Sequence, residues 1–141
     1  MTAASHWLLK SEPTTYSFDR LKTEKKAVWD GVRNVEARSN LRKMKLGDVC
    51  FFYHSNEGKA VVGLARVTRE AFQDPTTEDD WSAVEITYVA PMVNEVTLAQ
   101  MKSDSKLAAM AVVRRARLSV SPVTAAEFTR VLALGKTKLP K

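Results

Sequence analysis

At the centre of the chain lies Val49-Cys50-Phe51-Phe52-Tyr53-His54, an unbroken apolar and aromatic run that ends on a polar residue. A run of this length is typical of a central strand that is buried on both faces of a sheet. Residues 61–67 form a second such run, and residues 56–59 between them have the composition of a hairpin loop. Gly63 lies inside the second run, where glycine permits a bulge or a close approach by another segment. This part of the sequence therefore predicts a hairpin within a sheet.

Further strands are predicted on both sides of the hairpin, at residues 6–10, 84–88 and 118–123. The last of them is expected near a sheet edge, because Pro122 cannot donate a ladder hydrogen bond. Strands outnumber helices, and the helices fall at the ends and in the crossovers. The predicted fold class is therefore α/β (α+β), a strongly curved mixed sheet or small barrel with flanking helices.

Helices are predicted where a capping residue precedes an apolar stripe. Asn34 is a good N-cap for a helix that buries Ala37, Leu41 and Met44 and ends at Gly47. Similar N-cap signals occur at Ser17, Thr97 and Thr124. Residues 22–26 are charged and predicted to be exposed, and residues 136–141 are predicted to be a disordered basic tail. Residues 1–135 are thus expected to form a single domain.

Composition supports a small domain that needs no covalent staples. The chain has 141 residues, of which 45% are hydrophobic, and a single cysteine that cannot form an internal disulfide. No apolar run approaches the roughly 20 residues of a membrane helix. The first residues lack the pattern of a secretory signal. We expect a monomer that is cytoplasmic, or nuclear if its source is eukaryotic, with no membrane partner.

The charge of +6 is unevenly distributed along the chain. Residues 1–47 carry ten Lys or Arg and five Asp or Glu, residues 48–113 carry five and ten, and residues 114–141 carry seven and one. If the fold brings the two terminal segments together, they form one positive face suited to an anionic partner. A basic stripe at helical spacing lies in the first segment, and its members are candidates for phosphate contacts, with a solvated helix face as the alternative: Arg38, Arg42 and Lys45.

The patterns of several enzyme classes are missing from the sequence. The five glycines form no phosphate-binding loop, and two histidines with one cysteine are too few for a zinc site. Cys50 and His54 would lie roughly 13 Å apart on one strand, beyond hydrogen-bond reach. No catalytic residue, metal or cofactor is therefore expected.

Trp29 precedes the turn signal Asp30-Gly31 and lies close in sequence to Arg33 and Asn34. An aromatic face beside polar side chains suits an unstacked base, and such stacking contributes roughly 1–3 kcal/mol per base. A core position is the alternative, since most tryptophans are largely buried. Trp81 follows an acidic stretch and is a less certain candidate for a pocket wall.

The chain resembles an EVE domain, a family of the PUA-like superfamily to which YTH and ASCH domains also belong. The resemblance runs in order from Trp7 to about Leu134 and rests on these segments: Trp7-Leu8-Leu9-Lys10-Ser11-Glu12-Pro13, Trp29-Asp30-Gly31-Val32-Arg33-Asn34, Ala37-Arg38, Leu41-Arg42-Lys43-Met44, Gly47-Asp48, Phe51-Phe52-Tyr53-His54-Ser55, Val62-Gly63, Asp74-Pro75-Thr76, Trp81 and Arg117-Leu118-Ser119-Val120-Ser121-Pro122-Val123. It implies a PUA-like fold with an aromatic pocket that binds a modified nucleic-acid base without chemistry, a modified cytosine in DNA or a base in RNA.

By position in the family, the resemblance implies a pocket formed by Lys10, Ser11, Trp29, Val32, Arg33, Asn34, Tyr53, His54, Ser55, Trp81, Arg117, Leu118 and Ser119. Trp29 would be the stacking surface, and Asn34, Ser11 and His54 would read the edge of the base. Two other functions stay open. One is an ASCH-like hydrolase that acts on a modified nucleoside or RNA through Lys10 and Glu12. The other is a protein-interaction module with a vestigial pocket.

Overall fold

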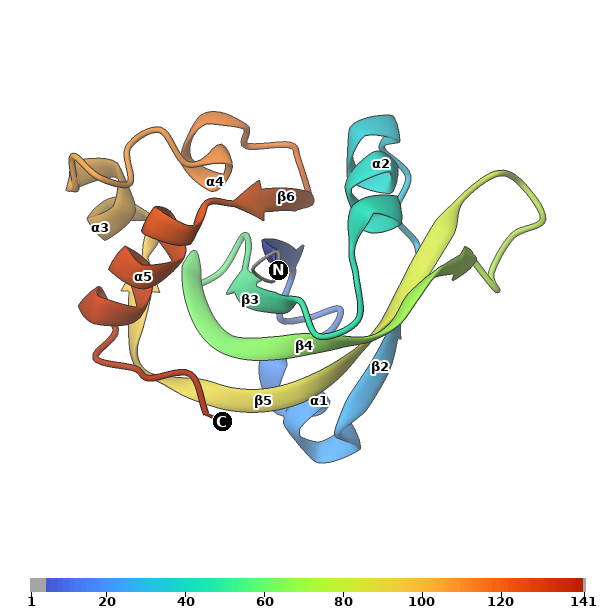
Figure 1. The fold of residues 1–141 in the computed structure, drawn as a ribbon, viewed down its shortest axis with the longest axis horizontal. Helices are drawn as coiled ribbons and strands as arrows, with labels where there is room; N and C mark the ends of the chain where they lie inside the picture. Colours follow the sequence, from blue (N-terminus) through green and yellow to red (C-terminus); the bar gives the residue numbers. More distant parts are fainter. Residues whose placement is uncertain (1–4, 141) are drawn as a thin grey trace.

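The computed structural model describes residues 5–140 and contains one mixed sheet with helices on both of its faces (Figure 1). Along the chain the elements are β1 (His6–Ser11), α1 (Phe18–Glu24), β2 (Lys26–Trp29), α2 (Val35–Lys43), β3 (Val49–His54), β4 (Ala60–Gln73), β5 (Ser82–Thr97), α3 (Leu98–Ser103), α4 (Ala111–Arg114), β6 (Val120–Val123) and α5 (Ala125–Leu134). The strand order is β2-β5-β4-β3-β1-β6. Strands β1 and β3 are parallel, and the other paired strands are antiparallel.

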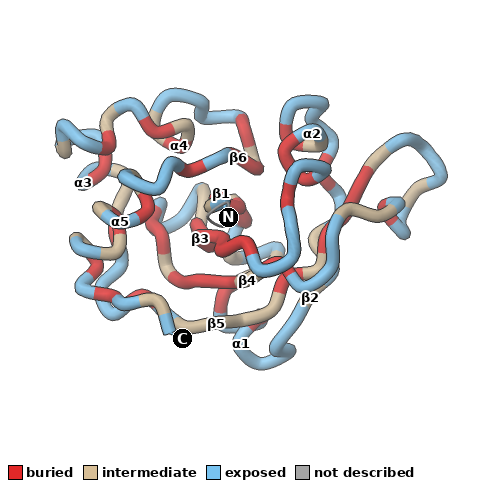
Figure 2. The backbone as a smooth tube through the Cα atoms, viewed as in Figure 1, coloured by how far each residue is buried: buried red, intermediate tan, exposed pale blue. Residues whose placement is uncertain are grey.

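Two neighbouring interior strands, β1 and β3, divide the core into two apolar layers, because successive side chains of a strand point to opposite faces. Leu9 and Phe52 pack on one face with residues of α1 and α2, whereas Leu8 and Phe51 pack on the other with residues of α3, α4 and α5. In Figure 2 the buried segments, in red, include these strands and much of β4. The predicted burial of residues 49–54 is confirmed: only His54 in that run retains appreciable exposure.

The sheet is strongly curved and open. Strands β4 and β5, with 14 and 16 residues, curve along their length (Figure 1). Several shifts of register between the two strands accompany this curvature. The sheet has β2 and β6 as its two edges, so the curved mixed sheet is confirmed, and the alternative of a closed barrel is wrong.

Gly63 serves both uses predicted for it. The β3–β4 pairing shifts register beside it, and the Phe18 ring of α1 occupies the place where a Cβ atom of residue 63 would be. The glycine thus lets α1 lie against the sheet, which no larger residue would permit without movement of the ring.

The predicted N-caps are confirmed. The side chains of Ser17, Asn34, Thr97 and Thr124 each accept a hydrogen bond from a backbone N–H in the first turn of a helix. Helix α2 ends at Lys43 with Met44 as its C-cap, so the prediction that it continues to Gly47 is wrong. Gly47 instead adopts a positive φ of 88° in the turn that leads into β3.

Strand β2 is absent from the sequence predictions, which assigned its first residue to an exposed charged segment. Its four residues alternate between exposed and half-buried, and they are fixed by antiparallel pairing with residues 84–87 of β5. Residues 136–141 are predicted to be a disordered tail, and two of them make contacts with the rest of the fold. Thr137 is buried and accepts a hydrogen bond from Val93 N, and Leu139 packs on the second core layer, while residue 141 lies outside the described residues.

The two basic terminal segments meet in the fold. Strand β6 pairs with β1, and α2 packs against β6. Arg115 joins them further, because its guanidinium forms a two-bond ion pair with Glu36 of α2. Within residues 5–140, no helix combines the length and the apolar character that crossing a bilayer requires.

Candidate functional site

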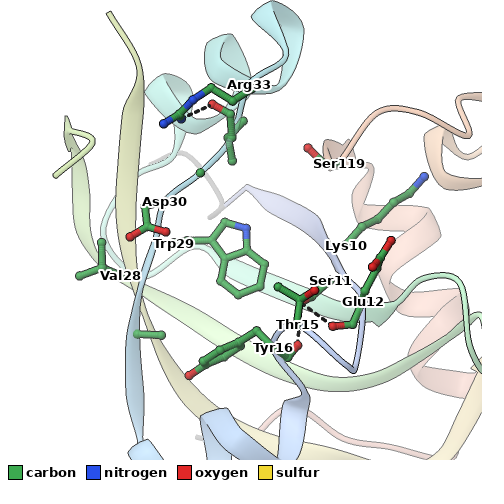
Figure 3. A pocket seen from close by; sticks show the side chains of 13 residues that line it. Lys10, Ser11, Glu12, Thr15, Tyr16, Val28, Trp29, Asp30, Arg33 and Ser119 are labelled. Carbon is green, nitrogen blue, oxygen red and sulfur yellow. Dashed lines mark hydrogen bonds between the residues drawn. The ribbon is translucent and has the colours of Figure 1, made fainter. Parts of the chain in front are cut away.

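A pocket of about 460 Å³ lies between edge strand β2 and the β1–β6 pair, on the side where the sheet does not close. This volume falls within the roughly 300–1,000 Å³ of small-molecule sites. Its lining comes from four parts of the chain: Lys10, Ser11, Glu12, Thr15, Tyr16, Ala27, Val28, Trp29, Asp30, Gly31, Val32, Arg33 and Ser119. Figure 3 shows the Trp29 indole in the middle of this group.

The orientation of Trp29 is set by two edge-on aromatic contacts. Its ring lies at 77° to Phe52 and at 85° to Tyr16, with centroids 5.5 and 5.9 Å away. Tyr16 is held in turn by a 2.7 Å hydrogen bond from its hydroxyl to Glu24. Burial and that carboxylate raise the pKa of Tyr16 to about 12, so its hydroxyl stays protonated and keeps donating. The indole is therefore supported from the side of the core and half-exposed toward the pocket.

The opposite wall is fixed by Lys10 and Ser11, at the end of β1. The Ser11 hydroxyl donates a 2.6 Å hydrogen bond to the carbonyl of Tyr16, which closes the turn that carries Glu12 and Thr15. The Lys10 ammonium donates to the carbonyls of Arg115 and Ala116 at 3.3 and 2.9 Å and holds the segment before β6. Burial lowers the pKa of Lys10.

The side of the pocket formed by the β2–α2 loop is held in place by Asp74, whose side chain has no exposed surface. Its carboxylate accepts hydrogen bonds from Gly31 N, from Arg33 Nη1, and from both the backbone N–H and the hydroxyl of Thr76. Burial opposes ionisation, but these donors outweigh it and hold the pKa of Asp74 well below its usual range. The β2–α2 loop is thereby tied to the loop between β4 and β5.

Part of the predicted site is assembled here. Six of the residues implied by the resemblance line the pocket: Lys10, Ser11, Trp29, Val32, Arg33 and Ser119. The others do not line it. Tyr53 packs in the second core layer, because it lies on the opposite face of β3 from Phe52, and Leu118 is buried in the first layer.

His54 and Asn34, expected to read the base edge, are engaged in structural hydrogen bonds. His54 Nε2 accepts from Phe18 N at 3.0 Å, and Asn34 Oδ1 accepts from Ala37 N as the cap of α2. Burial lowers the pKa of His54, which favours the neutral ring needed to accept that hydrogen bond. Ser55, Arg117 and Trp81 also lie outside the lining. The Trp81 ring instead packs against the guanidinium groups of Arg33 and Arg38, which lie 5.6 and 5.0 Å from its centroid.

Seven lining residues are absent from the predicted set: Glu12, Thr15, Tyr16, Ala27, Val28, Asp30 and Gly31. The lining residues in β2 and in the turn after it are placed by the pairing of β2 with β5, and the sequence carries no strong local signal for this pairing. Asp30 directly follows Trp29, and that adjacency is the one signal in the sequence that could have included it.

Of the predicted phosphate-binding residues, Arg38 and Arg42 lie on α2 and already contact other side chains, whereas Lys45 lies beyond the end of the helix. Asp80 accepts from Arg42 Nη2 at 2.6 Å and lies 3.6 Å from Arg38 Nη1, and Arg42 Nε also donates to Ser82. Lys45 is exposed, and its backbone N–H donates to Asp48. A phosphate that binds Arg38 or Arg42 would therefore compete with Asp80, whose side chain is 78% exposed.

Comparison with known proteins gives consistent matches over almost the whole chain. The EVE domain model matches residues 5–134. Human thymocyte nuclear protein 1 is 37% identical over 93% of this chain and 74% of its own length. Among solved structures, Atu2648 from Agrobacterium tumefaciens is 43% identical with a TM-score of 0.91, covering 98% of this chain and all of the other. Human THYN1, solved in complex with 5-methylcytosine-containing DNA, is 35% identical with a TM-score of 0.87, covering 96% of this chain and 99% of the other.

A more distant likeness concerns the fold alone. The YTH domain of Zygosaccharomyces rouxii MRB1, solved with N6-methyladenosine RNA, is 13% identical with a TM-score of 0.61. It supports the curved mixed sheet with flanking helices that the resemblance implied. The family model and the relatives above 30% identity confirm the resemblance: the chain belongs to the EVE domain family.

Proposed function

We propose that this chain is a non-catalytic module that binds a modified base of a nucleic acid in the Trp29 pocket, foremost a modified cytosine in DNA. The supporting observation is the indole of Trp29, held edge-on by Tyr16 and Phe52 and open to a pocket of about 460 Å³. The 5-methylcytosine-containing DNA bound to human THYN1 supports the same ligand class. RNA is the second substrate class to be tested.

The physical basis is a flipped or single-stranded base stacked on the indole. Stacking provides roughly 1–3 kcal/mol and tolerates any base. A methyl group adds only about 0.8 kcal/mol of burial, so selection for it requires a close wall. Ala27, which lies on the same face of β2 as Trp29 and lines the pocket, provides apolar surface for that wall.

Binding is tested with a set of oligonucleotides that differ only at one central cytosine, plain or 5-methylated, as single and double strands of DNA and as RNA. Trp29→Ala should weaken binding of the modified oligonucleotide by roughly 5- to 150-fold, the equivalent of the stacking energy. Trp81→Ala is the matched control, since that indole lies outside the pocket lining. Circular dichroism checks that both variants keep the fold.

Three outcomes are distinguishable. Loss in Trp29→Ala but not in Trp81→Ala supports the proposal. Equal binding of plain and modified oligonucleotides by the wild type and Trp29→Ala would reject it and favour a protein-interaction module. Equal loss in both variants would reject the assignment of the base to this pocket.

A hydrolase is the second candidate function, because Lys10 and Glu12 both line the pocket and burial lowers the pKa of Lys10. Its ammonium is already bound to two carbonyl groups, which disfavours a catalytic role. Incubation with N4-acylated cytidines decides between the two functions. Turnover that disappears in Lys10→Ala, with the fold retained, would establish the hydrolase.

A further inference from the structure

We propose that the pocket selects a base with an exocyclic amino group, such as cytosine, and that Asp30 is the residue that reads this group. The inference rests on the proposed function, because it presupposes that a base enters the Trp29 pocket. It adds a substrate requirement at the hydrogen-bonding edge of the base, separate from the methyl group.

The positively and negatively charged side chains of the pocket differ in how many hydrogen bonds they already make to the protein. Its cations are committed to the protein: Arg33 donates to Asp74, Thr76 and its neighbour's carbonyl, and Lys10 donates to two carbonyls. Its two carboxylates, Asp30 and Glu12, accept no hydrogen bond from another side chain and form no ion pair within residues 5–140, although the Asp30 carboxylate interacts with its own backbone N–H. An incoming ligand therefore meets free acceptors more readily than free cationic donors.

Asp30 is the better placed of the two carboxylates. It directly follows Trp29, and Figure 3 draws its carboxylate at the β2 ribbon from which the indole projects, whereas Glu12 lies across the pocket on the turn after β1. A base stacked on Trp29 would present its edge to a neighbour of the indole. Burial and the nearby charge of Asp74 raise the pKa of Asp30.

An ionised carboxylate only accepts hydrogen bonds. Cytosine and adenine offer an amino donor at the corresponding edge, whereas thymine, uracil and guanine carry a carbonyl oxygen there, and Asp or Glu accepting from cytosine N4 is an established mode of base recognition. A carbonyl facing Asp30 would leave both groups unpaired and mutually repelled. Thymine is the most informative competitor, because it carries the same 5-methyl group as 5-methylcytosine on the same ring.

The test compares one oligonucleotide with 5-methylcytosine, cytosine or thymine at the same unpaired position. The wild type should bind 5-methylcytosine roughly 5- to 150-fold more tightly than thymine, the range of one good base contact. Asp30→Asn can donate to the thymine carbonyl and should bring this ratio close to one. Glu12→Gln, the matched change in the other carboxylate, should leave it intact. Asp30→Ser, which removes the charge with a smaller side chain, should also lower the ratio and guards against an effect special to asparagine.

The preference for 5-methylcytosine over plain cytosine is recorded in parallel, because it reports the proposed function. If that preference is absent from the wild type, the proposed function fails. If it is present and depends on Trp29, but thymine binds as well as 5-methylcytosine, the reading of the amino group is wrong. The assignment to Asp30 is overturned if Asp30→Asn keeps the ratio, or if Glu12→Gln abolishes it instead.

Discussion

Arg33 Nη1 donates a hydrogen bond of 2.9 Å to Oδ2 of Asp74, a carboxylate with no exposed surface. The two residues belong to different loops, 41 positions apart, and the same carboxylate also accepts from Gly31 N in the turn beside Trp29. This contact therefore fixes the loop that forms one side of the pocket. It is the structural basis of the first prediction.

Asp74→Asn should destabilise the protein and reduce its pH dependence. The amide keeps the shape but loses the charge and places donors against Gly31 N–H, so the free energy of unfolding should fall by about 1–3 kcal/mol. The pKa of Asp74 is depressed in the folded state, so its contribution to stability is present above the unfolded pKa and is lost as the pH falls below about 4. Urea unfolding from pH 3 to 7 measures both effects. A mutant whose stability falls with acid as steeply as the wild type would contradict this role.

Gly63→Ala should destabilise the protein, because the new methyl group would overlap the Phe18 ring. Overpacking of this kind costs about 1–3 kcal/mol, measurable by chemical denaturation. Phe18→Leu removes most of the overlap, so the double variant should be more stable than the sum of the two single changes predicts. Strictly additive losses would show that the contact does not limit residue 63.

Asp80→Asn should strengthen binding to nucleic acid if Arg38 and Arg42 contact phosphates, because the change removes their competing carboxylate. The affinity should rise for plain and modified oligonucleotides alike, and the logarithm of the binding constant should fall more steeply with the logarithm of salt concentration. Asp79→Asn is the matched control, since Asp79 forms no ion pair with the residues described here, 5–140. Equal effects of both variants would indicate general charge attraction, and no effect would exclude the two arginines from the phosphate contacts.

Cys50 should be unreactive toward thiol reagents in the folded protein. Its side chain has no exposed surface, and burial raises the pKa of the thiol far above neutrality, so almost no thiolate is present. Modification with a chromogenic disulfide should proceed only as fast as the chain unfolds and become rapid in denaturant. Immediate, stoichiometric labelling under native conditions would contradict the burial of this residue.

The sequence could predict the features that depend on near neighbours. The apolar run at residues 49–54 identified the central strand, and Ser17, Asn34, Thr97 and Thr124 marked the helix starts, because burial periodicity and capping each involve residues within a few positions. The resemblance to the EVE domain added the fold family and half of a pocket. Strand β2 was not predicted, since it has only four residues and forms a strand only by pairing with β5.

Tertiary structure alone decided which side chains face the pocket. Tyr53 and Phe52 are adjacent in sequence, yet alternation along β3 sends the first to the far core layer and leaves the second to support Trp29. The pocket itself requires residues 10–16, 27–33 and 119 to meet where the sheet stays open, and that meeting follows from the order of six strands. Local sequence encodes the elements, but such a juxtaposition depends on contacts between positions as far apart as the 106 residues that separate Lys10 from Ala116, which no local pattern specifies.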